Sequence, residues 1–279
     1  MKKISRRSFL AAAGLSVAAL ALTACGGSSS SVASSVASSA ASSEAASTSA
    51  AAGELTTVEA GKLTMATNAT FPPYEMTTDS GEFEGIDIDT AKAIADKLGL
   101  ELQIDDMDFD AALLSVQQGK ADIVMAGVTV TDERKAVMDF SDSYATGIQS
   151  IIVPEGSDIA SPDDLAGKKI GTQRGTTGYI YCSDDFGDEN VVAYDDGLTA
   201  VQALNNGQVD AVVIDNAPAQ EFIAANPGLK ILDTSYAEED YAIGMAKGSS
   251  LEDAVNAALK ELKADGTLQS IVDKYITAE

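Results

Sequence analysis

The sequence contains no histidine and no tryptophan, and only two of its 279 residues are cysteines. Histidine is the commonest general base and metal ligand, so its absence argues against the usual forms of acid–base and zinc chemistry. Cys25 lies in the N-terminal leader described below, which leaves Cys182 without a second cysteine in the rest of the chain. We therefore expect no intramolecular disulfide, and neither a bound metal nor a cofactor.

Basic residues are also scarce. The chain has 18 Lys and Arg against 43 Asp and Glu, a formal net charge of −25 at pH 7. Such an acidic chain is a poor partner for nucleic acid and for anionic lipid surfaces. The charge could favour cationic ligands, but it mainly promotes solubility and a monomeric state.

The first residues have the pattern of an export signal. Four basic residues at positions 2, 3, 6 and 7 precede an apolar run, 9–22, that is too short to span a bilayer. The paired arginines resemble a twin-arginine signal, although ordinary secretory signals are also basic. The run Leu22-Thr23-Ala24-Cys25-Gly26 resembles a bacterial lipobox. We predict a signal peptide over 1–24 and lipidation of Cys25, which would anchor an exported protein to the outer face of the cytoplasmic membrane.

Residues 25–53 are almost entirely Ser, Ala, Gly, Val and Thr, with a single charge at Glu44. This composition cannot bury enough apolar surface to offset the entropy lost on ordering. We predict a flexible tether with a span of about 30 Å.

The remaining residues, 54–279, predict alternating strands and helices, which is the pattern of an α/β fold with parallel sheets. The pattern occurs twice. Residues 117–124 and 205–212 share one design, in which a helix ends at a glycine and an aspartate precedes an apolar strand. The first set of elements comprises strands at 63–67, 100–104 and 123–126 and helices at 87–98 and 109–118; the second comprises strands at 169–172, 191–194 and 209–215 and helices at 176–182 and 197–206.

Two β-rich runs, 149–153 and 241–246, separate the second set from the first set and from two closing helices at 251–263 and 267–276. Two extended crossings would form a hinge between two lobes. We predict a first lobe over 54–147 plus 243–279 and a second lobe over 148–242. Two sequential domains joined by one linker are the alternative.

The stretch 121–134 carries the most specific chemical signal. A short apolar run ends at Gly127, and Thr131 followed by two acidic residues is typical of a helix N-cap. Such a run is typical of a buried strand, and ligands of open α/β folds bind at the carboxyl ends of these strands. Arg134 lies in the first helical turn, where the helix dipole disfavours a cation, so a ligand carboxylate would explain its position. The alternative is a surface arginine paired with Asp132 or Asp139.

Several motifs together resemble the polar amino-acid-binding proteins of bacterial ABC importers: TNATFPPYE at 67–75, GIDIDTAK at 85–92, DFDAAL at 108–113, TVTDER at 129–134 and GKKIGTQRGTTG at 167–178. The resemblance covers the whole mature body. It implies a two-lobed periplasmic-binding-protein type II fold, with a mainly parallel sheet and flanking helices in each lobe. It also implies a binding protein, not an enzyme, that closes on a free amino acid and delivers it to a membrane permease.

The resemblance also implies roles for individual residues. Arg134 would bind the α-carboxylate and Asp215 the α-ammonium, although Asp215 could also cap the following helix. Phe71 would form an apolar wall, with Phe109 as a second contact or a core residue. The other implied ligand-binding residues are Asn68, Ala126, Gly127, Thr129, Gln173, Thr176 and Thr177.

The sequence also departs from the family pattern. Asn68 replaces an aspartate that members binding cationic amino acids can carry, and the pair 126–127 lacks the hydroxyl groups of some relatives. Both departures weaken the case for lysine or arginine as the ligand. Two further functions remain open, a dehydratase or lyase using a carboxylic acid such as Glu75 or Asp108, and a surface adhesin.

Overall fold

The computed structural model describes residues 55–276, which belong to one compact unit spanning 51–279. The predicted signal peptide, Cys25 and the whole tether lie outside the described residues. Within 55–276 no helix combines the length and apolar character needed to cross a membrane. The same residues contain no cluster of three or more acidic or cysteine side chains suited to a metal ion.

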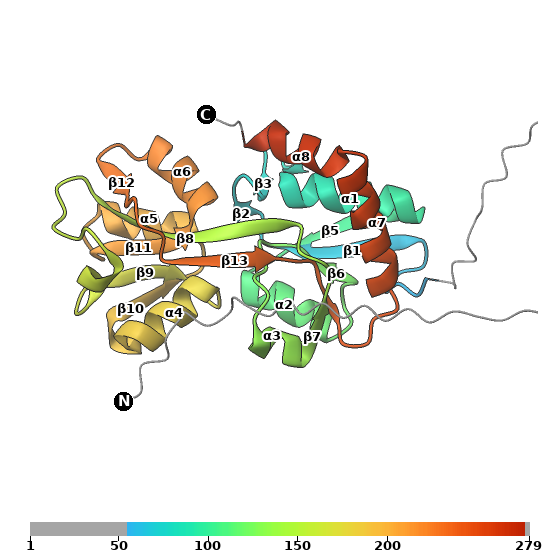
Figure 1. The fold of residues 1–279 in the computed structure, drawn as a ribbon, viewed down its shortest axis with the longest axis horizontal. Helices are drawn as coiled ribbons and strands as arrows, with labels where there is room; N and C mark the ends of the chain where they lie inside the picture. The colour runs from blue at the N-terminus through green and yellow to red at the C-terminus, as the bar shows by residue number, and fades with distance from the viewer. Residues whose placement is uncertain (1–54, 277–279) are drawn as a thin grey trace, which may run out of the picture. The chain divides into compact units, whose positions relative to one another are not determined.

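The first sheet has five strands in the order β5-β1-β6-β14-β7. Strand β1 lies parallel to β5 and β6, whereas β14 is antiparallel to β6 and β7. Helices α1, α7 and α8 pack together over one face and α2 lies on the other (Figure 1). The bounds are β1 Lys62–Thr67, α1 Ile86–Leu98, β5 Glu101–Asp106, α2 Phe109–Gln117, β6 Ile123–Val124, α3 Asp132–Val137, β7 Met138–Phe140, β14 Gly244–Ala246, α7 Glu252–Ala264 and α8 Thr267–Tyr275.

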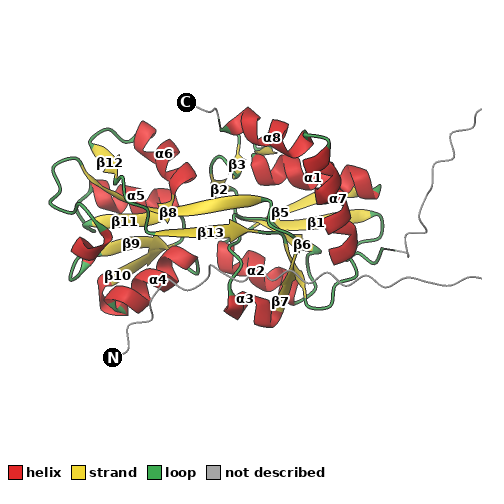
Figure 2. Cartoon of the chain, viewed as in Figure 1, coloured by secondary structure: helices red, strands yellow, loops and turns green. Residues whose placement is uncertain are grey.

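The second sheet has the order β10-β9-β11-β8-β12, and β13 also pairs with β8. Strands β10, β9 and β11 are parallel, and the other three pairs are antiparallel, so both sheets are more mixed than a parallel pattern predicts. Helices flank both sheets (Figure 2). The bounds are β8 Ala145–Pro154, η1 Pro162–Leu165, β9 Ile170–Gln173, α4 Thr177–Phe186, η2 Asp188–Asn190, β10 Val191–Tyr194, α5 Gly197–Asn205, β11 Ala211–Asp215, α6 Asn216–Ala225, β12 Leu229–Ile231 and β13 Ala237–Tyr241.

Several strands are buried on both faces, which explains why their sequences are continuous apolar runs. In β1, Leu63 and Met65 belong to the core under α1 and α7, whereas Ala66 belongs to the core under α2. In β11, Val212 and Val213 likewise separate into two cores on opposite faces. We call the parts built on the first and second sheets the first and second lobes.

Two strands connect the lobes. Strands β8 and β13 run side by side between the two sheets, paired antiparallel from Ala145 to Gln149 (Figure 1). The second crossing therefore begins earlier than the predicted run at 241–246. Gly147 is required here because a Cβ at this position would overlap the ring of Tyr241.

Part of the motif at 67–75 belongs to a small three-stranded sheet, β2-β3-β4. Its strands are β2 Thr70–Phe71, β3 Glu75–Thr77 and β4 Phe83–Glu84. Strands of two or three residues are too short to show a period in the sequence, so the pattern did not reveal them.

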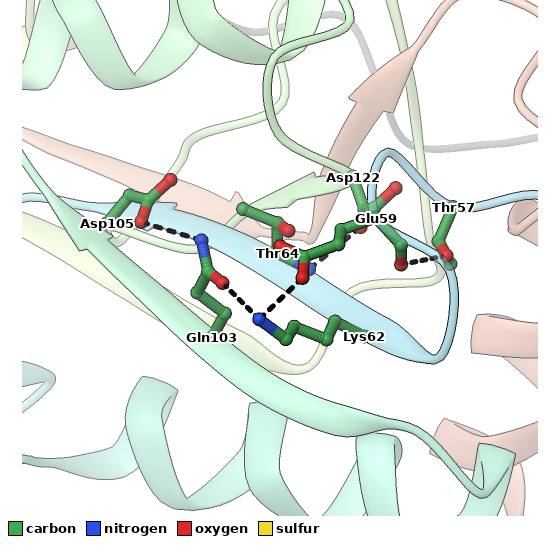
Figure 3. Close-up of polar contacts among 7 residues, drawn as sticks. All are labelled: Thr57, Glu59, Lys62, Thr64, Gln103, Asp105 and Asp122. Atoms are coloured by element: carbon green, nitrogen blue, oxygen red, sulfur yellow. Dashed lines mark hydrogen bonds and ion pairs between the residues drawn. The ribbon is translucent and has the colours of Figure 1, made fainter.

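The aspartates of the internal repeat have a common structural role. The Asp122 carboxylate accepts hydrogen bonds from the backbone N–H groups of Thr64 in β1, at 2.7 Å, and of Val58, at 2.7 Å. Figure 3 shows Asp122 beside β1, where Lys62 also joins Glu59 and Gln103. In the second lobe Asp210 accepts from Lys169 N, just before β9, at 2.8 Å. Each aspartate thus fixes the start of the neighbouring parallel strand.

Asp122→Ala is expected to destabilise the protein by about 2–4 kcal/mol, because two backbone N–H groups lose a charged acceptor in a largely buried setting. Asp210→Ala removes one exposed hydrogen bond and should cost less than about 1 kcal/mol. Urea unfolding of the two variants measures the difference. Equal losses would show that burial of the carboxylate does not decide its contribution.

Candidate functional site

A pocket forms where the carboxyl ends of strands from both sheets face each other. Asn68 follows β1, Ala126 lies just beyond β6, and Gln173 and Asp215 end β9 and β11. The space between its lining residues is about 440 Å³ when the solvent at its mouth is included. Its lining residues are Asn68, Phe71, Glu75, Phe109, Ala126, Gly127, Thr129, Arg134, Gln149, Gln173, Thr176, Thr177, Val213, Ile214, Asp215 and Tyr241.

All eleven predicted ligand-binding residues lie in this lining. The five that the sequence analysis did not assign to the pocket are Glu75, Gln149, Val213, Ile214 and Tyr241. Four of these belong to the crossing strands or to β11, whose sequence patterns predict buried strands and give no sign of a ligand. The sequence indicates Glu75 only as a possible general acid. Its position directly after the apolar run Phe71–Tyr74 is the one local sign that this acid is buried.

Arg134 is buried, with 8% of its surface exposed. Thr131 caps α3 by accepting from Arg134 N, as the sequence predicts. The guanidinium donates to the carbonyl of Thr129 at 2.8 Å and, across to the second lobe, to the carbonyl of Gly175 at 3.1 Å. It lies 5.3 Å from the centre of the Phe109 ring. The alternative of a surface arginine paired with Asp132 or Asp139 is therefore wrong.

Burial lowers the pKa of Arg134, and the negative charge of Glu239 opposes this effect. None of the ion pairs between residues of the described segment involves Arg134. Asp139 instead pairs with Lys247 at 2.6 Å. A guanidinium has five N–H donors, so Arg134 retains the capacity to bind an anion in the pocket.

Asp215 faces the pocket from the second lobe and is also buried. Its carboxylate accepts from Ala217 N at 3.0 Å, which caps α6, and from Ile148 N at 2.7 Å, which lies in β8. The predicted capping contact is thus present. Burial nevertheless raises the pKa of Asp215 to about 6, despite these hydrogen bonds. A cation at this site would relieve the cost of burying the ionised form.

The two lobes also meet through polar contacts in the pocket. The Gln173 amide donates to the side-chain oxygen of Asn68 at 2.8 Å, although these residues are 105 positions apart. The Cα of Gly175 approaches Asp110 so closely that a Cβ would overlap its carboxylate. Gly178 is also tightly packed, since a Cβ at this position would lie 2.9 Å from the Gln149 amide oxygen.

Aromatic rings close the apolar sides of the pocket. Phe71 stacks on Tyr74 with ring centres 5.8 Å apart, and its ring edge lies against Gly127. Phe109 belongs to a buried core cluster and also lines the pocket.

Two buried acids lie at the pocket: Glu75 lines it, and Asp87 lies behind the lining. Burial and the nearby charge of Asp87 raise the pKa of Glu75 well above its usual range, and burial raises that of Asp87 to about 6. The Asp87 carboxylate accepts from Gly127 N at 3.1 Å and from the Tyr144 hydroxyl at 2.8 Å. Repulsion between two adjacent buried carboxylates favours a proton on Glu75, whose neutral form can donate a hydrogen bond.

Comparison with known proteins identifies similar chains that are all solute-binding proteins. Residues 63–278 match the model of the bacterial extracellular solute-binding proteins, family 3. The chain is 32% identical over 226 residues to the L-cystine-binding protein TcyJ of Escherichia coli (strain K12), covering 79% of this chain and 85% of that protein. It is 33% identical over 228 residues to the arginine-binding extracellular protein ArtP of Bacillus subtilis (strain 168), covering 78% and 87%.

A solved structure of an ancestral arginine-binding protein bound to glutamine is 43% identical, with a TM-score of 0.74 over 78% of this chain and 99% of that chain. The two-lobed architecture described above is the periplasmic-binding-protein type II fold. The chain belongs to the bacterial extracellular solute-binding proteins of family 3.

Proposed function

We propose that this protein is the amino-acid-binding component of an ABC importer, capturing a free polar amino acid between its lobes and delivering it to a membrane permease. One observation carries the proposal: Arg134 from the first lobe and Asp215 from the second line the same pocket, and neither forms an ion pair with a residue of the described segment. Relatives named for binding arginine, cystine and glutamine support it.

In this proposal Arg134 binds the α-carboxylate of the ligand and Asp215 binds the α-ammonium. Both ligand charges lose water on entering the pocket, so each needs an opposite charge with good geometry. The guanidinium supplies two parallel donors, and the ammonium restores a favourable environment for the ionised form of Asp215. Ligand binding then stabilises the closed lobes through contacts that exist only when both sides are engaged.

The remaining lining residues would surround the ligand side chain. Phe71 and Phe109 contact its apolar portion, and Asn68, Gln173 and the neutral Glu75 offer hydrogen bonds to a polar end. An amide side chain satisfies this set without a net charge. A cationic side chain would instead lower the pKa of Glu75 and favour its ionised form.

The proposal includes the setting of the protein. The chain is an exported lipoprotein held at the outer face of the cytoplasmic membrane through Cys25 and the tether 25–53, and it acts as a monomer. The lobes divide at 54–147 plus 243–279 and at 148–242, which agrees with β14 joining the first sheet. The relatives and the family are solute-binding proteins rather than enzymes, and nothing in the comparisons supports the lyase or adhesin alternatives.

A thermal-shift screen of the full chain against the common L-amino acids, cystine and ornithine tests the function. A ligand at 100 times its Kd should raise the free energy of unfolding by about 2.7 kcal/mol. The expected hits are among arginine, glutamine, histidine and cystine. The absence of any shift at millimolar concentrations would overturn the proposal.

Gly175→Ala should weaken binding of the amino acid found in that screen by up to about tenfold, because the new methyl group displaces the Asp110 carboxylate where the lobes close. Gly207→Ala is the matched control, since Gly207 has a similar positive φ, +67 against +74, but open space around its Cα. Both substitutions incur the same backbone strain. Calorimetry should show that only Gly175→Ala loses affinity, and equal losses would exclude the steric explanation.

A further inference from the structure

Strand β13 places one acid inside the protein between two acids outside it. Glu238 and Asp240 are exposed, whereas only 7% of Glu239 is exposed. Side chains alternate along a strand, so a regular pattern places Glu239 on the inner face. Glutamate is almost never buried without partners, and its environment therefore requires an explanation.

Three donors converge on one oxygen of Glu239. Oε2 accepts from the hydroxyls of Thr177 at 2.9 Å and Thr129 at 3.1 Å, and from the Gln149 amide at 3.0 Å. The other oxygen, Oε1, is buried and has no hydrogen-bond partner among residues 55–276. All three donors line the pocket, but Glu239 does not. It therefore lies behind the wall and contacts a ligand only through these side chains.

These contacts determine which way the two hydroxyls point. A hydroxyl group has a single hydrogen, and an ionised carboxylate can only accept. With both hydrogens directed at Glu239, neither threonine can donate to the other across their 3.4 Å separation. Neither can donate to a ligand carboxylate. The threonine oxygens keep lone pairs and so present acceptors rather than donors.

The charge of Glu239 also favours a positive group in the pocket. Burial lowers the pKa of Arg134, and Glu239 opposes this effect and so helps to keep the guanidinium charged. Burial raises the pKa of Asp215, and Glu239 adds to this effect and so disfavours the ionised carboxylate. The carboxylate is thus close enough to influence both ends of the proposed ligand site. A positive group between Glu239 and Asp215 would relieve their repulsion.

We propose that Glu239 is a positioning residue that holds the hydroxyls of Thr129 and Thr177 as acceptors and so sets the preference of the pocket for a ligand with a protonated α-amine. This inference rests on the proposed function. The threonines come from different lobes, so the acceptor pair is complete only when the lobes are together.

Calorimetry on the full chain with two matched probes provides the test. The first probe is whichever of L-arginine or L-glutamine binds more tightly, and the second is the same molecule without its α-amino group, 5-guanidinopentanoate or 4-carbamoylbutanoate. Glu239→Gln removes the charge and adds a competing donor, so the hydroxyl hydrogens are no longer fixed. Affinity for the amino acid should fall about tenfold, while affinity for the deaminated probe should change less than about twofold. Glu238→Gln, the same change on the exposed face, should alter neither.

Equal losses for both probes would reduce Glu239 to a structural role, and an unchanged amino-acid affinity would overturn the inference directly. If Glu239→Gln does not fold, Thr177→Val decides, because it removes one acceptor oxygen while two donors still hold Glu239. It should show the same selective loss, whereas Thr177→Ser should retain native selectivity. A native protein that binds none of the amino acids in the thermal-shift screen would overturn the proposed function, and this inference with it.

Discussion

Arg134→Ala is expected to reduce amino-acid affinity by at least about 1,000-fold, because the α-carboxylate would be buried without its charge partner. The protein should remain folded. The substitution removes a buried cation that forms no ion pair within the described segment, and the Thr131 cap of α3 accepts from a backbone N–H that alanine retains. Arg134→Lys keeps the charge but loses the planar pair of donors, so its affinity should be intermediate.

Arg174→Ala is the matched control for this experiment. Arg174 precedes the Gly175 carbonyl that Arg134 contacts, but its own side chain is 57% exposed and lies 3.9 Å from Asp195. Exposed pairs of this kind contribute about 0–1 kcal/mol. Calorimetry should therefore show near-native affinity for Arg174→Ala and no measurable heat for Arg134→Ala. Near-native binding by Arg134→Ala would refute the assignment of the carboxylate subsite.

The parts of the fold that depend on local pattern were predictable from sequence. Glycine ends α1 at Gly99 in a left-handed conformation, and Thr131 and Asp215 cap helices through their own side chains. The sequence echo between residues 117–124 and 205–212 corresponds to two sheets in which Asp122 and Asp210 hold the neighbouring strand. In the first case each residue and its partner are close in the chain. In the second case the same sequence pattern occurs twice.

The parts that depend on distant contacts were not predictable in this way. Glu239 occurs in the acidic run Glu238–Asp240, and only the pairing of β13 with β8 shows that one of these acids is internal. Gln149 contacts the pocket because β8 crosses between the lobes. The absence of a side chain at Gly178 leaves room for the Gln149 amide, a contact between distant parts of the chain. The resemblance in motifs indicated residues that line the pocket, but it did not indicate Glu239, which contacts three of the lining residues from behind.

Asp215→Asn is expected to lower amino-acid affinity by about 100-fold or more, since the α-ammonium would lose its opposite charge in a buried site. Asparagine is also a good N-cap, so α6 should retain its start and the protein its fold. Asp196→Asn makes the same change at the N-cap of α5, away from the pocket lining, and should bind normally. A normal affinity in Asp215→Asn would assign the ammonium to another group.

The pH dependence of binding gives an independent test of Asp215. Burial raises its pKa from the ordinary 3.8 to about 6, and an ammonium requires the ionised form. Native affinity should therefore be constant above about pH 7 and fall about tenfold per unit below pH 6. The stability of the ligand-free protein should change with pH in the opposite direction. Between pH 3.8 and about 6 the folded state binds more protons than the unfolded state. The contribution of Asp215 to stability is therefore present at low pH and is lost as the pH rises through about 6.

Asp215→Asn should abolish this pH dependence of affinity as well as most of the affinity itself. Asp87 is the group that could mimic the effect, because burial also raises its pKa to about 6. Its carboxylate contacts Gly127 N and the Tyr144 hydroxyl beneath the pocket and does not line it. Calorimetric titrations of both proteins between pH 5 and about pH 8 separate the two acids. A tenfold fall per unit that persists in Asp215→Asn would transfer the titration to the Glu75–Asp87 pair and remove the electrostatic basis for placing the ammonium at Asp215.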